Sequence, residues 1–139
     1  MTEKAQKDVD VLIIGAGSGG YVAAIRAAQL GRKVVLVDKA ELGGVCLNRG
    51  CIPSKALISA SERVKHIKGA NLMGIKVSGE VEVDMPEVVK WKDGVVNKLT
   101  SGVQSLLKGN GVEVISGEAY LTEPHTVRIR TENGEQFYS

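Results

Sequence analysis

The sequence predicts an α/β fold, with a parallel sheet built from a βαβ unit and a small antiparallel β-meander after it. Two apolar runs, Val9 to Ile14 and Lys33 to Val37, flank a glycine-rich stretch and an alanine-rich helical segment. Short, continuous apolar runs are typical of strands buried on both faces of a sheet. After residue 117, alternating strand-like segments separated by turn residues predict the meander.

The βαβ unit contains a G-x-G-x-x-G pattern at Gly15, Gly17 and Gly20. The first glycine permits a tight turn, the second lets a pyrophosphate approach the backbone, and the third lets the helix pack close to the strand. Asp38 ends the second strand, 18 positions after Gly20, where an acid can accept a hydrogen bond from a ribose hydroxyl. All parts follow in the required order, which predicts a Rossmann-like dinucleotide-binding unit.

The two cysteines, Cys46 and Cys51, are five positions apart. They cannot bond within one regular helix, because a disulfide needs Cα atoms within roughly 4.4–6.8 Å. One is therefore expected in a loop that folds back onto the other. Pro53 suits the first turn of a helix, so Cys51 is expected at a helix N-terminus, which favours a thiolate. The arrangement favours a redox-active pair that forms a disulfide, and inert buried thiols or a structural staple are the alternatives.

Composition restricts the classes of function. The 139 residues are 43% hydrophobic and carry a formal net charge of +2, which fits one domain or part of one and gives no reason to expect nucleic acid or a membrane as partner. The first apolar run is too short for a signal peptide, so a cytoplasmic location is expected, where cysteine pairs are more often catalytic or metal-binding than structural. His66 and His125 lie at no recognised ligand spacing, so no metal site is expected.

The remaining elements follow from apolar periodicity and turn residues. Residues 1–7 are polar and expected to be frayed. Asp84 is expected to cap a long helix that starts at Pro86. The predicted ranges are helices from Pro53 to about Ile67 and from Pro86 to Lys108, a third strand of the main sheet from Val112 to Ile115, and meander strands at Gly117 to Leu121, Val127 to Thr131 and Gln136 onward.

The segment from Gly43 to Lys55, GGVCLNRGCIPSK, resembles the redox-active disulfide signature of the flavin- and pyridine-nucleotide-dependent disulfide oxidoreductases, class I. Together with the segment from Trp91 to Thr100, it resembles the dihydrolipoamide dehydrogenase branch of that family, over essentially the whole chain. A mercuric, glutathione-type or related disulfide reductase is the alternative within the superfamily. A truncated dinucleotide-binding module without turnover is the alternative from a different class.

The resemblance implies that the dinucleotide is FAD, and that electrons pass from dihydrolipoamide through the cysteine pair and the flavin to NAD⁺. It implies that Cys46 exchanges with the substrate, that Cys51 lies beside the flavin and that Lys55 lies near the flavin ring. The implied partners are the lipoyl domain of a 2-oxo acid dehydrogenase complex and a second copy in a homodimer. The other implied FAD contacts are Gly15, Gly17, Gly20, Asp38, Lys39, Gly44, Cys46 and the backbone of Ala119.

Three departures from the family pattern bear on function. Asp38 stands where a Glu is usual, so its ribose contact is either direct or through water. Arg49 replaces a small apolar residue and either lowers a cysteine pKa or faces solvent. The third departure is the largest: the sequence stops at Ser139, before the strand and the second flavin-contacting segment that complete the family's FAD domain, and no second strand–G-x-G-x-x-G–helix unit follows Asp38. The resemblance implies that residues 1–139 form the N-terminal, C-terminally incomplete part of an FAD-binding domain, without the nicotinamide-binding and interface domains, and such a piece is expected to be inactive alone.

Overall fold

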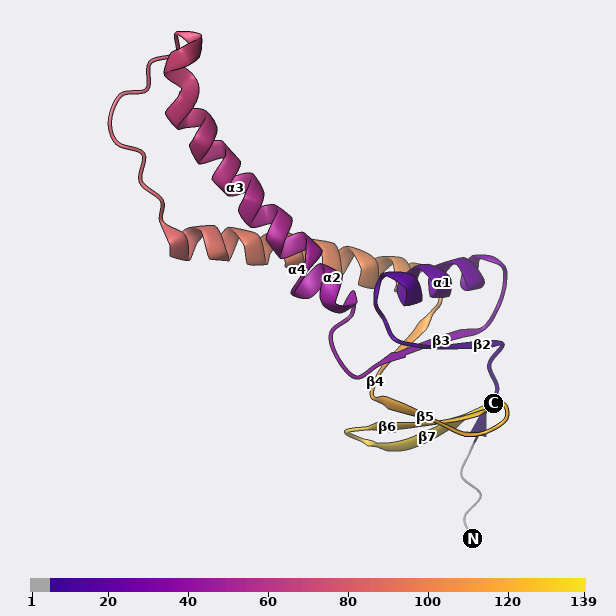
Figure 1. The fold of residues 1–139 in the computed structure, drawn as a ribbon. Helices are drawn as coiled ribbons and strands as arrows, with labels where there is room; N and C mark the ends of the chain where they lie inside the picture. Colours follow the sequence, from indigo (N-terminus) through magenta and orange to yellow (C-terminus); the bar gives the residue numbers. More distant parts are fainter. Residues whose placement is uncertain (1–5) are drawn as a thin grey trace.

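The computed structural model describes residues 6–139 and consists of two stacked sheets with helices on one side (Figure 1). The first sheet is parallel and carries α1 on its outer face. The second sheet is the small meander, and the ends of the described chain lie near each other beside it. Of the two long helices, α3 (Cys51–Gly69) extends away from both sheets, whereas the C-terminal part of α4 (Met85–Gly109) lies beside α1. The predicted α/β class is confirmed.

The parallel sheet has the strand order β2-β3-β4, formed by β2 (Val11–Ile14), β3 (Val34–Asp38) and β4 (Glu113–Ser116). Helix α1 (Ser18–Gln29) connects β2 to β3, so the predicted βαβ unit is present. Strand β4 pairs parallel with β3, which confirms the predicted third strand. The central position of β3 explains its continuous apolar sequence, because both of its faces are covered.

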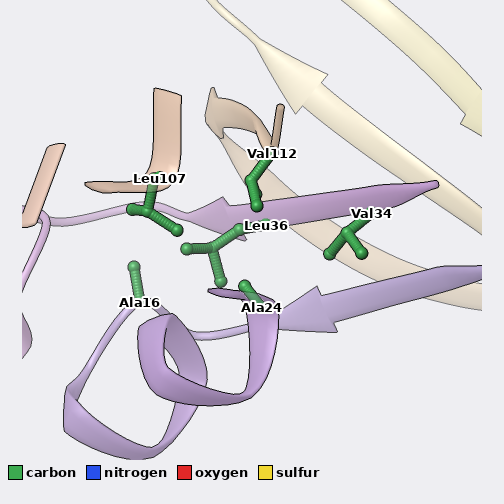
Figure 2. Packing of buried hydrophobic residues seen from close by; sticks show 6 residues of the cluster. All are labelled: Ala16, Ala24, Val34, Leu36, Leu107 and Val112. Carbon is green, nitrogen blue, oxygen red and sulfur yellow. The ribbon is translucent and has the colours of Figure 1, made fainter. Parts of the chain in front are cut away.

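Side chains of β3 enter two separate cores because they alternate between the faces of the sheet. Leu36 points toward α1 and the C-terminal part of α4, in a cluster with Leu107 (Figure 2). Val37 points the other way, toward the second sheet, where it packs in a cluster with Ile129 and Tyr138. One strand therefore joins α1, α4 and the meander into a single body. The first cluster consists of Ala16, Ala24, Val34, Leu36, Leu107 and Val112.

The second sheet has the order β1-β7-β6-β5. Strands β5 (Glu118–Glu123), β6 (Thr126–Thr131) and β7 (Gly134–Tyr138) pair antiparallel, as the sequence predicted. Strand β1 (Gln6–Lys7) adds to this sheet parallel to β7. The expectation that residues 1–7 are frayed is therefore wrong for residues 6 and 7, and for residues 1–5 it lies outside the described residues.

Strand β1 is held by contacts that local sequence could not reveal. The Lys7 ammonium donates to the Tyr138 hydroxyl at 3.2 Å, and the N–H of Val9 donates to the Ser139 carbonyl at 2.9 Å. Both partners lie at the other end of the chain. The polar composition of the first residues gave no sign of this strand pairing.

The helical part consists of α2 (Gly44–Asn48), α3 (Cys51–Gly69), the 3₁₀ helix η1 (Ala70–Met73) and α4 (Met85–Gly109). The predicted cap of α4 is confirmed, because the Asp84 carboxylate accepts the N–H of Glu87 at 3.2 Å. Within residues 6–139, no helix combines the length and the apolar character that crossing a membrane requires.

Helices α3 and α4, here called the α3–α4 hairpin, bury few of their residues. Ala56 is the buried residue of α3, and Val96 and Leu107 are those of α4. Two cavities of about 520 and 620 Å³ lie between the helices, and Val64 and Val88 line both. Large apolar side chains of the hairpin remain exposed, among them Leu57, Ile58, Ile67, Met85, Val89, Trp91, Leu99 and Leu106.

Candidate functional site

The glycine-rich loop between β2 and α1 has the geometry that its spacing predicted. Gly15 adopts φ of +105° and its N–H donates to the Val37 carbonyl at 2.7 Å. A Cβ at Gly20 would overlap the Gly15 carbonyl oxygen, so α1 packs directly on the loop. A Cβ at Gly17 would meet no atom within 4 Å. Helix α1 starts after Gly17, which has no side chain to cap the first N–H groups, and such groups favour an anion.

The Asp38 carboxylate is already hydrogen-bonded to the backbone. Its Oδ2 accepts the N–H of Ala16 at 2.6 Å, and its Oδ1 accepts the N–H of Ala40 at 2.8 Å. A carboxylate has about four acceptor positions, so both oxygens keep capacity for a ribose hydroxyl. The predicted ribose contact stays a prediction, and holding the glycine-rich loop is a second role that the sequence did not reveal.

Four of the predicted cofactor residues line one cavity of about 270 Å³ at the carboxyl ends of β2 and β3. Parallel α/β sheets bind ligands at this edge. The cavity is smaller than the roughly 300–1,000 Å³ of pockets for whole ligands, so it suits one part of a dinucleotide. The chain thus brings residues 15 and 119 together across the sheet edge. The four residues are Gly15, Asp38, Lys39 and Ala119.

Two charged side chains near the rim of this cavity, Glu118 and Arg130, were not predicted from the sequence. Glu118 lines the cavity and lies 3.7 Å from the Lys39 ammonium. The Tyr120 hydroxyl donates to Glu118 at 2.6 Å, and the Arg130 guanidinium donates to it at 2.8 Å. Both hydrogen bonds lower the pKa of Glu118, the one from Tyr120 more than the one from Arg130. No local pattern links Lys39 with Glu118, because only the tertiary fold brings these segments together.

The cysteine pair lies on two consecutive helices rather than on a loop and a helix. Cys51 is the first residue of α3, as predicted, but Cys46 lies inside the short helix α2. Gly43 and Gly44 precede Cys46 with φ of +96° and +62°, a backbone conformation that favours glycine. These two glycines make the turn that the loop was expected to make, so the helix of Cys46 corrects the prediction.

Both thiols are free in the structure, so it does not contain the predicted disulfide. Cys51 is exposed and Cys46 is half-buried. The pKa of Cys46 is raised, mainly by a hydrogen bond with the Cys51 side chain and secondly by burial. The positive charge of Lys55 lowers this pKa. The two sulfur atoms are thus close enough to interact, and the disulfide stays a prediction for the oxidised chain.

Helix α2, here called the cysteine helix because it carries Cys46, is in direct contact with the glycine-rich loop. The N–H of Gly43 donates to the Ala16 carbonyl at 2.9 Å. A Cβ at Gly44 would lie 2.8 Å from the Cα of Gly17, so a larger residue could not fit between the two segments. The two motifs that the sequence identified separately therefore form one continuous surface.

Three further residues have defined places. Lys55 is exposed on α3, one turn after Cys51. Arg49 is exposed and donates to the Glu41 carboxylate at 2.8 Å. Of the two proposals for Arg49, the structure therefore supports the exposed position, with Glu41 as its partner. His125 lies in the turn between β5 and β6 with φ of +67°.

The sequence family agrees with this combination of a dinucleotide loop and a thiol pair. A family profile described as pyridine nucleotide-disulphide oxidoreductase matches residues 9–138, and the chain belongs to this family. The resemblance drawn from the cysteine signature is thereby confirmed.

Similar proteins refine this placement. The chain is 58% identical over 132 residues to the dihydrolipoyl dehydrogenase of Bacillus subtilis (strain 168), which is 95% of this chain and 28% of that protein. The dihydrolipoyl dehydrogenase of Geobacillus stearothermophilus is 56% identical over 132 residues, with the same coverage. Dihydrolipoyl dehydrogenase 3 of Haloarcula marismortui is 53% identical over 120 residues, or 86% of this chain and 25% of that protein. The chain spans little more than a quarter of the length of these relatives.

Proposed function

We propose that the chain carries the redox-active cysteine pair and the first half of the FAD site of a dihydrolipoyl dehydrogenase-type flavin disulfide oxidoreductase. The contact between the cysteine helix and the glycine-rich loop carries this proposal. A ligand whose one end lies in the cavity beside Asp38 and whose phosphates lie at Gly17 would continue toward α2 and α3. An extended dinucleotide has this shape, and the relatives named dihydrolipoyl dehydrogenase support dihydrolipoamide as the substrate.

Three groups of residues in the chain suit three parts of FAD. The cavity would take the adenosine half, the uncapped start of α1 would take the pyrophosphate, and α2 and α3 would face the flavin. When bound, FAD would supply an acceptor for two electrons and pass them to NAD⁺. The residues proposed for the three parts are Gly15, Asp38, Lys39 and Ala119; Gly17 and Gly20; and Gly44, Cys46, Cys51 and Lys55.

The thiol chemistry proposed for this chain is a disulfide exchange in which the cysteine pair accepts both electrons from the substrate. A thiolate of dihydrolipoamide attacks the sulfur of Cys46 in the oxidised pair, the Cys46–Cys51 bond breaks, and Cys51 leaves as a thiolate. The second substrate thiol loses its proton and attacks the substrate sulfur bound to Cys46. The cyclic disulfide of lipoamide forms and Cys46 leaves. The substrate loses two electrons and two protons, and the pair gains the two electrons.

The larger assembly belongs to the same proposal. Residues 1–139 would be the N-terminal part of an FAD-binding domain, and the whole enzyme would be a homodimer that acts on a lipoyl domain of a 2-oxo acid dehydrogenase complex. The chain alone would bind FAD weakly and would not form NADH, since it offers half of the contacts and no nicotinamide site. The cytoplasmic location stays a prediction.

Disulfide exchange can be tested without flavin. The oxidised chain is treated with excess dihydrolipoamide, quenched by alkylation and analysed by mass spectrometry. We expect two new thiols in the chain and one lipoamide per chain. In a matched pair of variants exposed to oxidised lipoamide, Cys51→Ser should trap the substrate as a mixed disulfide on Cys46, and Cys46→Ser should trap much less. An unreduced pair, or stronger trapping by Cys46→Ser, would contradict the proposal.

The FAD site can be tested at Gly17, where an added Cβ would meet no protein atom within 4 Å but would intrude on a pyrophosphate. Titration with FAD, followed by flavin fluorescence, should show weak saturable binding that Gly17→Val abolishes. Gly94→Val is the matched control, because that position in α4 is also open and lies far from the loop along the chain. Equal binding by the two variants, or NADH formation from dihydrolipoamide by the chain alone, would refute this part.

A further inference from the structure

We propose that Asp38 is a positioning residue for the cysteine pair, and that it acts through Ala16 and Gly43. The inference extends the proposed function, since it gives the acid at the end of β3 a task that does not involve a bound nucleotide. It uses only contacts of the protein with itself, so it can fail while FAD binding stands.

The first link is the bond between Asp38 and Ala16. The carboxylate Oδ2 accepts the Ala16 N–H at 2.6 Å, and the second oxygen is held by the Ala40 N–H at 2.8 Å. A carboxylate that accepts backbone N–H groups makes stronger hydrogen bonds than a neutral acceptor. Ala16 is 1% exposed and packs in the core cluster with Leu36 and Leu107. Its position is therefore fixed on both sides, by the core and by the carboxylate.

The second link runs from Ala16 to the start of the cysteine helix. The Ala16 carbonyl accepts the N–H of Gly43 at 2.9 Å. Gly43 is the N-cap of α2, and α2 has only five residues. A helix this short cannot form by itself, because nucleation costs more than its few internal hydrogen bonds return. Its place depends on its anchors, and Gly43 is the anchor nearest to the dinucleotide loop.

The rest of α2 transmits this position to Cys46. The Asn48 side chain donates to the Leu42 carbonyl at 3.0 Å and to the Gly44 carbonyl at 2.9 Å, which joins both ends of the helix to the preceding turn. Cys46 lies between these contacts, and its hydrogen bond with Cys51 raises its pKa. Moving the start of α2 would separate the two thiols and expose Cys46. Loss of the Asp38 bond should therefore make Cys46 more reactive.

The chain offers a matched control for this bond. The Asp10 carboxylate accepts the N–H of Lys33 at 2.6 Å, at the opposite end of β2 and β3. Asp10→Asn and Asp38→Asn each replace a carboxylate that holds one strand end to its neighbour. Only the second lies on a path to the thiols. A purely structural role would let both variants act alike on the cysteines.

The experiment measures alkylation of each cysteine in the fully reduced chain, by mass spectrometry, together with hydrogen exchange of the Ala16 amide. Asp38→Asn should speed alkylation of Cys46 by about threefold or more, because a lower pKa raises the thiolate fraction, and should expose the Ala16 amide to exchange. Asp10→Asn should leave the Cys46 rate unchanged.

Asp38→Glu, which keeps a carboxylate, provides a second variant if Asp38→Asn does not fold. The Cys46 rate and the exchange of the Ala16 amide must change together in every folded variant. A variant that frees the Ala16 amide while Cys46 reacts at the wild-type rate would overturn the proposal, as would an equal effect of Asp10→Asn. No flavin is present, so failure of FAD binding cannot produce either result.

Discussion

The nucleotide end of the molecule and the α3–α4 hairpin differ in how they are held. Around the glycine-rich loop, Leu36 and Ala24 are 0% exposed, and strand ends are joined by hydrogen bonds between distant segments. In the hairpin, α3 has 19 residues and buries only Ala56 among them. Figure 1 shows α3 extending away from the sheets, whereas the C-terminal part of α4 lies beside α1.

Contacts within this chain fix the dinucleotide loop, whereas α3 buries one residue and α4 enters the core near its C-terminal end, where Leu107 is buried. The cysteine pair lies where the two regions meet. Cys46 belongs to the anchored side through Gly43, and Cys51 is the first residue of the hairpin. The cysteine pair therefore lies between an element anchored to the dinucleotide loop and a long helix that buries one residue.

The largest effect is expected on the free energy of unfolding, when a core side chain is compared with one of the α3–α4 hairpin. Leu36→Ala removes a fully buried side chain and should lower the free energy of unfolding by about 2–5 kcal/mol. Leu57→Ala removes a side chain of α3 that is 40% exposed and should cost about 1 kcal/mol or less. Urea unfolding of both variants measures the contrast. Equal losses would mean that the hairpin is packed as tightly as the core.

The second prediction concerns the close packing of α1 on the glycine-rich loop. Gly20→Ala places a methyl group against the Gly15 carbonyl and should cost about 1–3 kcal/mol, as overpacking does. Gly19→Ala is the matched control in the same turn of α1, since its added methyl group would meet no atom within 4 Å. It should be neutral or slightly stabilising, because Ala favours a helix over Gly. Thermal unfolding of the two variants measures this difference. A Gly20→Ala variant as stable as wild type would contradict the close packing at Gly20.

The third effect concerns the junction between the regions. The Cys51 hydrogen bond is the first cause of the raised pKa of Cys46, so Cys51→Ala should lower this pKa toward its ordinary value of 9.0. In the reduced wild type the raised pKa stabilises the fold below pH 9.0, and this contribution is lost as the pH rises through the folded-state value. Ultraviolet titration of the thiolate measures the shift. An unchanged Cys46 pKa would show that the two thiols do not interact.

The smallest effect tests the exposed rim of the cavity. The hydrogen bond from Tyr120, and to a smaller extent the one from Arg130, lowers the pKa of Glu118 below its ordinary value of 4.5. The carboxylate therefore stabilises the fold above pH 4.5, and this contribution is lost as the pH falls through the folded-state pKa. Glu118→Gln should be slightly less stable than wild type near neutral pH, and the difference should close in acid. Solvent screens the partly exposed group, so a large or pH-independent difference would contradict the assignment.

Sequence alone determined the features that depend on a residue and its near neighbours. The spacing of Gly15, Gly17 and Gly20, the continuous apolar run of β3 and the Asp84 cap follow from local backbone geometry and periodicity. The cysteine signature identified the family for the same reason. Local rules also placed Cys51 at a helix start, because Pro53 restricts the backbone of the first turn.

Tertiary structure decided which distant residues meet. The pairing of β1 with β7, the Lys39–Glu118 rim and the path from Asp38 through Ala16 to Gly43 join segments far apart in sequence. It also decided that Cys46 lies in a helix, since a five-residue helix exists only where its surroundings anchor it. Such contacts depend on strand register and packing across the whole fold, and no window of neighbouring residues contains that information.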